Sequence, residues 1–194
     1  MIAERRIILQ NTGKIDPEKI DDYISAGGYL SATKALSMPP HELIEEIIKS
    51  GLRGRGGAGF PTGLKAKYTG QATASKSQKF LVCNADEGEP GTFKDRIIME
   101  NDPHLLIEGM IIAAYSIGAT KAFIYLRGEY TRSIYLINRA IQQSQERGYL
   151  GKNVFSSDFS LDIKVKPGAG SYLCGEELTL LESLEGKRGY PRIK

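Results

Sequence analysis

Residues 79–91 read KFLVCNADEGEPG, and this stretch decides the fold. Residues 79–83 form an apolar run with the length of a buried strand, and an acidic loop at 84–91 follows it directly. Two similar runs occur later, KAFIYL at 121–126 and LDIKV at 161–165. Buried strands separated by long helical stretches indicate right-handed crossovers and a mainly parallel sheet. The sequence therefore predicts a three-layer α/β domain.

The segments between these strands predict helices and loops. Helix 40–49 begins with proline and is followed by a glycine, and Asp16 is the expected N-cap of an earlier helix. Residues 7–9 could form a short strand, and the small, polar segment 70–78 predicts a mobile loop. The expected helices span 17–25, 40–49, 93–100, 103–117, 131–147 and 176–184.

In parallel sheets, ligands bind beyond the carboxyl ends of the strands. The segments that follow the predicted strands are the acidic loop 84–91, residues 127–130 and the glycine-bearing loop 167–175. We therefore expect these three segments to lie near one rim of the sheet.

The composition is that of an ordinary soluble globular protein of about one domain. The 194 residues are 41% hydrophobic and 25% charged, and the net charge of +3 gives no argument for binding nucleic acid or membrane. The longest apolar run, from Leu105, carries Glu108 and is shorter than the roughly 20 residues that span a bilayer. The N-terminus lacks the form of a signal peptide, so a cytoplasmic location is expected.

Residues 54–65, GRGGAGFPTGLK, combine glycines with two cations. The dinucleotide fingerprint G-x-G-x-x-G is met literally, but a helical segment precedes it where a strand is required. A Walker A loop is excluded because Ala66 follows Lys65, so the magnesium-binding hydroxyl is absent. Bare backbone beside Arg55 and Lys65 favours a phosphate or pyrophosphate ligand. The alternative is a surface loop that binds nothing.

Other polar residues leave more than one interpretation open. Asp86, Glu87 and Glu89 could hold a metal, accept hydrogen bonds from ribose or ribityl hydroxyls, or form a solvated turn. His41 and His104 have no companion at metal-ligand spacing and are expected to be capping or surface residues. The two cysteines, Cys83 and Cys174, are expected to be buried thiols.

Three motifs in fixed order carry a family resemblance: GLRGRGGAGFPTGLK at 51–65, VCNADEGEPGTFKDR at 82–96 and GAGSYLCGEELTLLESLEGKRGYPR at 168–192. Together they resemble the flavoprotein subunit of NADH:quinone oxidoreductase (complex I) and the related subunits of NAD-dependent hydrogenases and formate dehydrogenases. The resemblance implies a Rossmann-like domain that holds FMN and NADH in one pocket. FMN would accept hydride from NADH and pass electrons to iron–sulfur clusters. Residues 51–194 would form this domain, and 1–50 a helical segment packed on it.

The resemblance also implies roles for individual residues. Phe60 would stack on adenine, Glu89 would lie beside the nicotinamide ribose, and Lys194 would be a cation near the nucleotide. Ala66 stands where the family usually has tryptophan, and Tyr68 can fill the place of a second adenine-stacking aromatic. The full set of implied cofactor-binding residues is Gly54, Arg55, Gly56, Gly57, Ala58, Phe60, Lys65, Tyr68, Asn84, Asp86, Glu87, Glu89, Tyr172, Gly175, Glu176, Glu177 and Lys194. No side chain is expected to act as a catalytic acid or base.

The family continues beyond the final PRIK, so the chain is expected to be the N-terminal part of such a subunit. An asparagine-rich FMN phosphate site and a domain with a 4Fe-4S cluster would follow in the missing C-terminal region. The implied partners are a thioredoxin-like 2Fe-2S subunit and a larger iron–sulfur subunit of a complex peripheral to the membrane. The final acceptor stays open between quinone, protons, ferredoxin and carbon dioxide. The alternative function is a redox-inactive nucleotide-binding or assembly fragment.

Overall fold

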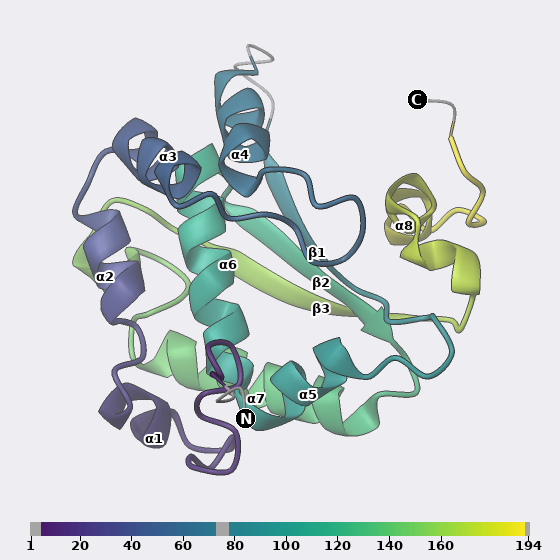
Figure 1. The fold of residues 1–194 in the computed structure, drawn as a ribbon, viewed down its shortest axis with the longest axis horizontal. Coiled ribbons are helices and arrows are strands. Elements are labelled where there is room, and N and C mark those ends of the chain that lie inside the picture. Colours follow the sequence, from purple (N-terminus) through teal and green to yellow (C-terminus); the bar gives the residue numbers. More distant parts are fainter. Residues whose placement is uncertain (1–4, 73–77, 193–194) are drawn as a thin grey trace.

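A three-stranded parallel sheet forms the centre of the computed structural model, which describes residues 5–72 and 78–192 (Figure 1). Its strands are β1 (Phe80–Ala85), β2 (Lys121–Arg127) and β3 (Asp162–Gly168), in the order β1-β2-β3. Asn84 pairs with Tyr125, and Tyr125 pairs with Lys166. All three strands therefore end at the same edge, as a parallel sheet requires. The predicted α/β fold is confirmed.

Helices surround the sheet. The earlier ones are α1 (Ile20–Ser25), α2 (Leu30–Leu36), α3 (Pro40–Lys49) and α4 (Thr62–Gln71). The later ones are α5 (Lys94–Asn101), α6 (Pro103–Ile117), α7 (Thr131–Glu146) and α8 (Glu177–Leu184). Two short 3-10 turns are η1 (Val154–Ser156) and η2 (Tyr172–Gly175).

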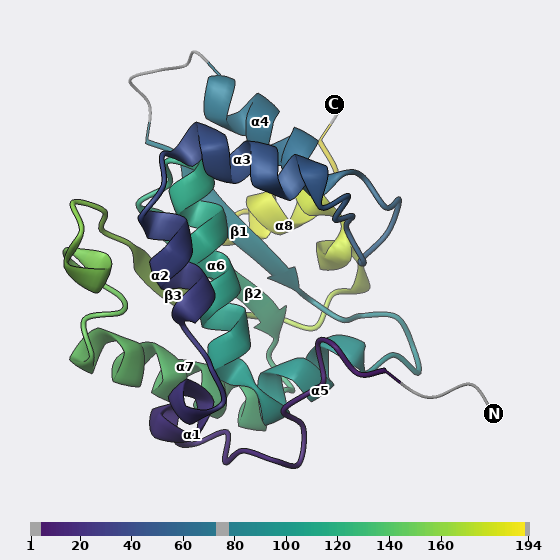
Figure 2. The same cartoon turned by 60° about the vertical axis from the view of Figure 1, so that its left-hand side comes forward.

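The alternation of side chains along β2 divides the core into two parts. Ala122, Ile124 and Leu126 belong to the large core that α6 and α7 share with the sheet, whereas Tyr125 faces Cys174 and Leu180 on the opposite side. Figure 1 shows α6 crossing in front of the strands and α8 standing apart from the other helices, and Figure 2 gives a second view of this arrangement. The helix α8 and the turn η2 thus form the third layer.

A buried polar network attaches the N-terminal helices to α6. The Glu108 carboxylate accepts hydrogen bonds from the Tyr23 hydroxyl at 2.5 Å and from the Tyr29 and Ala32 amides at 2.9 Å each. These amides are at the start of α2, so Glu108 satisfies the N-terminus of a helix far away in sequence. The division at residue 50 stays a prediction.

Several local predictions were wrong. Residues 7–9 form turns instead of a strand, and α1 begins at Ile20 because the Asp16 carboxylate accepts from the Glu18 amide within a turn before the helix. The helices α2 and α4 were not predicted. In the polar segment 70–78, residues 73–77 lie outside the described residues, and residues 70–71 end α4.

His104 is buried, which contradicts the expected capping or surface role. Its side chain is 1% exposed, and its ring nitrogens contact the Tyr29 hydroxyl at 2.7 Å and the Gln143 amide oxygen at 3.1 Å. Burial lowers the pKa of His104 to about 4. Cys174 is buried as expected, and Cys83 is half-buried with its pKa raised by burial to about 11.

Candidate cofactor site

Three segments from distant parts of the sequence line one cavity of about 430 Å³ at the carboxyl edge of the sheet. They are the glycine-rich loop, the acidic loop after β1 and the turn η2 with the start of α8. The lining residues are Gly56, Asn84, Asp86, Glu87, Gly88, Glu89, Thr92, Lys94, Asp95, Tyr172, Leu173, Gly175 and Glu176. The loops that were expected to converge do so.

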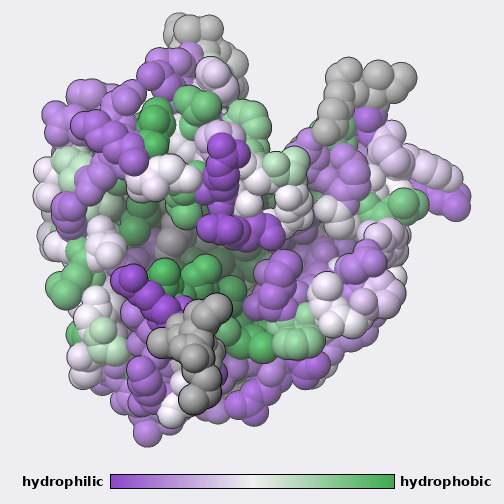
Figure 3. All heavy atoms as spheres, in the orientation of Figure 1, coloured by the Kyte–Doolittle hydropathy of each residue, from purple (hydrophilic) through white to green (hydrophobic). Residues whose placement is uncertain are grey.

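A second cavity of about 500 Å³ lies between α4, β1, α6 and α8. Lys65 of α4 and Glu177 of α8 line it, and apolar side chains such as Leu180 and Ile117 form its floor. Figure 3 shows the molecule deeply notched between the side of α4 and the side of α8. This elongated, two-part hollow is polar at the loops and apolar along the sheet, which is the character of a small-molecule site.

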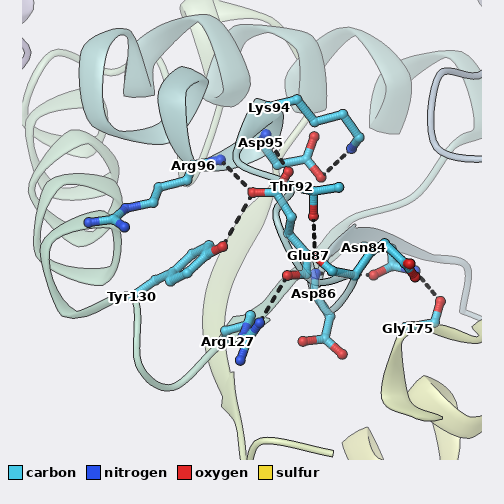
Figure 4. Close-up of polar contacts among 11 residues, drawn as sticks. Asn84, Asp86, Glu87, Thr92, Lys94, Asp95, Arg96, Arg127, Tyr130 and Gly175 are labelled. Atoms are coloured by element: carbon cyan, nitrogen blue, oxygen red, sulfur yellow. Dashed lines mark hydrogen bonds and ion pairs between the residues drawn. The ribbon is translucent and has the colours of Figure 1, made fainter. Parts of the chain in front are cut away.

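Asn84 joins the parts of the hollow. It lines both cavities and also a third of about 530 Å³, where Arg55 and Phe93 lie. Its Nδ2 donates to the Gly175 carbonyl at 2.9 Å, and its Oδ1 accepts from the Asp86 amide at 3.2 Å. Asn84 therefore ties the acidic loop to η2 across the cavity mouth (Figure 4).

Glu87 is a support for the loop. Its carboxylate is buried and accepts from the Asp95 amide at 3.0 Å, the Arg96 amide at 3.2 Å and the Tyr130 hydroxyl at 3.3 Å (Figure 4). The two amides belong to the first turn of α5, which has unsatisfied N–H groups that attract a carboxylate. Direct contact of this carboxylate with a cofactor would require these hydrogen bonds to break.

Asp86 is in a different position. Its Oδ2 atom is buried and has no hydrogen-bond partner among the described residues. Burial raises the pKa of Asp86, while the nearby Arg127 guanidinium acts in the opposite direction. A buried carboxylate oxygen without a partner, beside a cavity, suits a ligand that donates a hydrogen bond.

Glu89 and Tyr172 meet across the cavity. The Tyr172 hydroxyl donates to the Glu89 carboxylate at 2.7 Å, and this bond raises the pKa of Tyr172. A Cβ atom on Gly88 would lie 3.4 Å from the Tyr172 ring. The acidic loop and η2 are thus joined both here and at Asn84.

The glycine-rich loop is closed at its base and open at its tip. The Gly54 amide donates to the Phe60 carbonyl at 3.0 Å, and the Thr62 amide to the Leu52 carbonyl at 2.9 Å. A Cβ atom on Gly56 or Gly57 would meet no atom of the described residues within 4 Å. Packing within the chain therefore does not explain these glycines, whereas close approach of a ligand to the backbone does.

The structure brings most of the predicted site residues to these cavities, with some exceptions. Phe60 and Tyr68, proposed to stack on adenine, are 51% and 63% exposed and do not line the three cavities, and neither do Gly54, Gly57 and Ala58. Glu176 caps α8 by accepting from the Leu178 and Thr179 amides. Lys194 lies outside the described residues.

Arg127 and Tyr130 are contacts that the sequence analysis placed near the rim but did not select. Their position directly after a central strand was the available signal. Within residues 5–72 and 78–192, no group of three or more histidine, cysteine, aspartate or glutamate side chains is arranged to hold a metal. In the same ranges, no helix has the length and apolar character needed to cross a membrane.

Comparison with known proteins identifies relatives over nearly the whole chain. The F subunit of the NADH-quinone oxidoreductase of Aquifex aeolicus (strain VF5) is 54% identical over 97% of this chain and 43% of its own length. The HndC subunit of the NADP-reducing hydrogenase of Solidesulfovibrio fructosivorans is 51% identical over 97% of this chain and 38% of its own length. The chain thus spans less than half the length of these curated relatives.

Solved structures agree with the sequence relatives. A crystal structure of an NAD⁺-reducing [NiFe]-hydrogenase in the H₂-reduced state matches 82% of this chain and 27% of its own chain, with 41% identity and a TM-score of 0.73. The Nuo51 FMN-binding domain family matches residues 47–194. The chain belongs to the Nuo51 FMN-binding domain family, whose relatives include the flavoprotein-type subunits of NADH-quinone oxidoreductases and NAD(P)-linked hydrogenases.

Proposed function

We propose that this chain is the FMN- and NADH-binding part of an NADH dehydrogenase subunit. One observation supports it most: the glycine-rich loop, the acidic loop and η2 line one cavity, in which Gly56 has no packing role and the buried Asp86 Oδ2 has no partner among the described residues. An open backbone cradle and an acceptor that awaits a donor fit a flavin nucleotide, which offers a phosphate and several N–H and O–H groups. The residues present therefore fit FMN.

Within this proposal the residues divide by chemistry. Lys65 and Arg55 supply positive charge for phosphate groups, and the start of α4 at Thr62 adds the favourable end of a helix dipole. Asp86 and Asn84 accept or donate hydrogen bonds to the ring system or the sugar chain. Glu89 accepts from the ribose of NADH.

FMN, when bound, supplies the chemistry of accepting hydride from NADH and releasing single electrons. The chain's own residues bind the two nucleotides, align them and exclude water. Electrons would leave toward iron–sulfur centres, including a 4Fe-4S cluster outside this sequence, a thioredoxin-like 2Fe-2S subunit and a larger iron–sulfur subunit. The complex would be peripheral to the cytoplasmic face of a membrane.

Flavin binding tests this proposal directly. FMN is titrated into the purified chain and the quenching of flavin fluorescence is measured, followed by anaerobic addition of NADH. Gly56→Val should weaken FMN binding tenfold or more because it fills the cradle, without loss of thermal stability. Gly109→Ala is a matched control, since a Cβ atom there also meets nothing within 4 Å but lies on α6.

The outcomes separate the candidate functions. FMN binding that Gly56→Val weakens, with bleaching of the flavin by NADH, supports the redox function. Binding without bleaching would favour the redox-inactive nucleotide-binding alternative. No FMN binding, or equal binding by both variants, would contradict the assigned site.

A further inference from the structure

We propose that Arg127 and Tyr130 are positioning residues for the cofactor pocket and that they act through Glu87. This inference rests on the proposed function, because the pocket is the one assigned to FMN. Neither side chain lines the cavity of the acidic loop. Both lie behind that loop, on the segment that follows the central strand β2.

The two side chains hold opposite ends of Glu87. Arg127 is the last residue of β2, and its Nη1 donates to the Glu87 carbonyl at 3.2 Å. The Tyr130 hydroxyl donates to the Glu87 carboxylate at 3.3 Å. Figure 4 shows both residues reaching the acidic loop from the side opposite to Gly175. The main chain and the side chain of Glu87 are thereby fixed to the sheet.

The acidic loop depends on such side-chain contacts. Its own backbone hydrogen bonds are short-range, from the Glu87 amide to the Ala85 carbonyl, Gly88 to Asp86 and Thr92 to Glu89. These bonds shape turns but do not attach the loop to another element. Glu87 is also the neighbour of Asp86, whose buried oxygen is directed to the ligand in the proposed function. A shift of Glu87 would therefore move Asp86 as well.

The aromatic ring of Tyr130 is itself restrained. The guanidinium carbons of Arg96 and Arg127 lie 5.4 Å and 5.7 Å from its centroid, within the range of cation–π attraction. Arg127 Nε also contacts the Glu129 carboxylate at 3.4 Å. Arg127 thus has fixed partners on three sides, and these contacts define its direction toward Glu87.

The same segment abuts the other wall of the pocket. A Cβ atom on Gly128 would lie only 2.6 Å from the Gly168 carbonyl oxygen, and one on Gly170 would lie 3.2 Å from the Glu129 carboxylate. Residues 127–130 therefore contact both the acidic loop and the loop that leads to η2. The geometry makes this segment the common support for the two walls.

Three variants test the proposal: Arg127→Met, Arg127→Lys and Tyr130→Phe. Arg132→Met is the matched control, because Arg132 is exposed and has no hydrogen bond or ion pair among the described residues. Three quantities are measured for each: FMN affinity, hydrogen–deuterium exchange of residues 86–96, and the thermal midpoint.

Arg127→Met should weaken FMN binding about tenfold or more, the effect of losing one charge-assisted hydrogen bond that orders the site. It should also accelerate exchange at residues 86–96 while the thermal midpoint changes little, since the side chain of Arg127 is 30% exposed. Arg127→Lys should recover part of the affinity because it retains the charge. Tyr130→Phe should have a smaller effect, because the Glu87 carboxylate keeps its two amide donors.

Exchange and affinity equal to wild type in Arg127→Met would overturn the positioning role. So would an equal loss of affinity in Arg132→Met. Absence of FMN binding by the wild-type chain would overturn the proposed function instead, and the exchange measurement would still decide whether Arg127 orders the loop. The two failures are therefore distinguishable.

Discussion

Replacing Glu108 by glutamine should destabilise the whole chain, although the side chain is far from the candidate site. Glu108 is 6% exposed and accepts three hydrogen bonds from groups of the N-terminal helices. One oxygen accepts from the Tyr23 hydroxyl and the Tyr29 amide, and the other accepts from the Ala32 amide. Each of these three groups is a donor.

A glutamine amide has only one acceptor oxygen, so it must place its NH₂ group against at least one of these donors. The variant loses one charged hydrogen bond, and the remaining two become neutral. Hydrogen bonds to charged groups contribute about 1.5–3 kcal/mol and neutral ones about 1 kcal/mol, so the expected loss is about 2–4 kcal/mol. Domains of this kind unfold with about 5–15 kcal/mol, so a large fraction of the stability is involved.

Urea unfolding followed by circular dichroism measures this loss as a shift of the midpoint at constant slope. Tyr23→Phe is the graded companion, because it removes one donor and leaves the carboxylate with both amides. It should lose about 1 kcal/mol. Hydrogen exchange at the Tyr29 and Ala32 amides should accelerate more in Glu108→Gln. If Glu108→Gln unfolds at the wild-type urea concentration, the carboxylate does not anchor the N-terminal helices and this reasoning is refuted.

Three further outcomes are expected. Because burial lowers the pKa of His104 from 6.5 to about 4, the unfolded chain binds the proton first, so stability should fall as the pH decreases. The loss should be about 1.5 kcal/mol between pH 6.5 and about pH 5, and urea midpoints of His104→Gln should lack this component. Gly128→Ala should destabilise by about 1–3 kcal/mol in urea unfolding, because its Cβ would lie 2.6 Å from the Gly168 carbonyl oxygen, whereas Gly109→Ala should not. Glu89→Gln should weaken NADH binding by about 1.5–3 kcal/mol and leave FMN content unchanged, as calorimetry and flavin absorbance would show; loss of flavin with retained NADH affinity would contradict the assignment.

The elements that the sequence predicted well carry their own boundary signals. The ranges 40–49 and 103–117 match α3 and α6, and each of these helices has a proline in its first turn. The α6 helix also has Asp102 as N-cap, with its side chain accepting from the Leu105 amide, and Gly118 in the left-handed conformation at its end. Such signals lie within a few residues of the helix and need no knowledge of the fold.

The elements that were missed depend on distant contacts. The α2 helix has no side-chain cap of its own, and its first amides are satisfied by Glu108, 76 to 79 residues later in the chain. The α4 helix contains Gly63 and Gly70, which argue against a helix. Gly63 is needed because a Cβ atom there would lie 2.6 Å from the Ile48 backbone, so α4 packs closely on α3. No local pattern could reveal either contact.

The same distinction narrows the candidate site. In the sequence, the acidic residues of the two loops are equivalent candidates for binding a nucleotide. In the structure, Glu87 caps α5 and Glu176 caps α8, so these carboxylates are bound to backbone amides. Asp86 keeps a buried oxygen without a partner among the described residues, and exposed Glu89 is held by the neutral hydroxyl of Tyr172. Because a helix-capping carboxylate must break hydrogen bonds before it can bind a ligand, substitutions at Asp86 and Glu89 should change ligand affinity directly, whereas those at Glu87 and Glu176 should act by disordering the helix that each one caps.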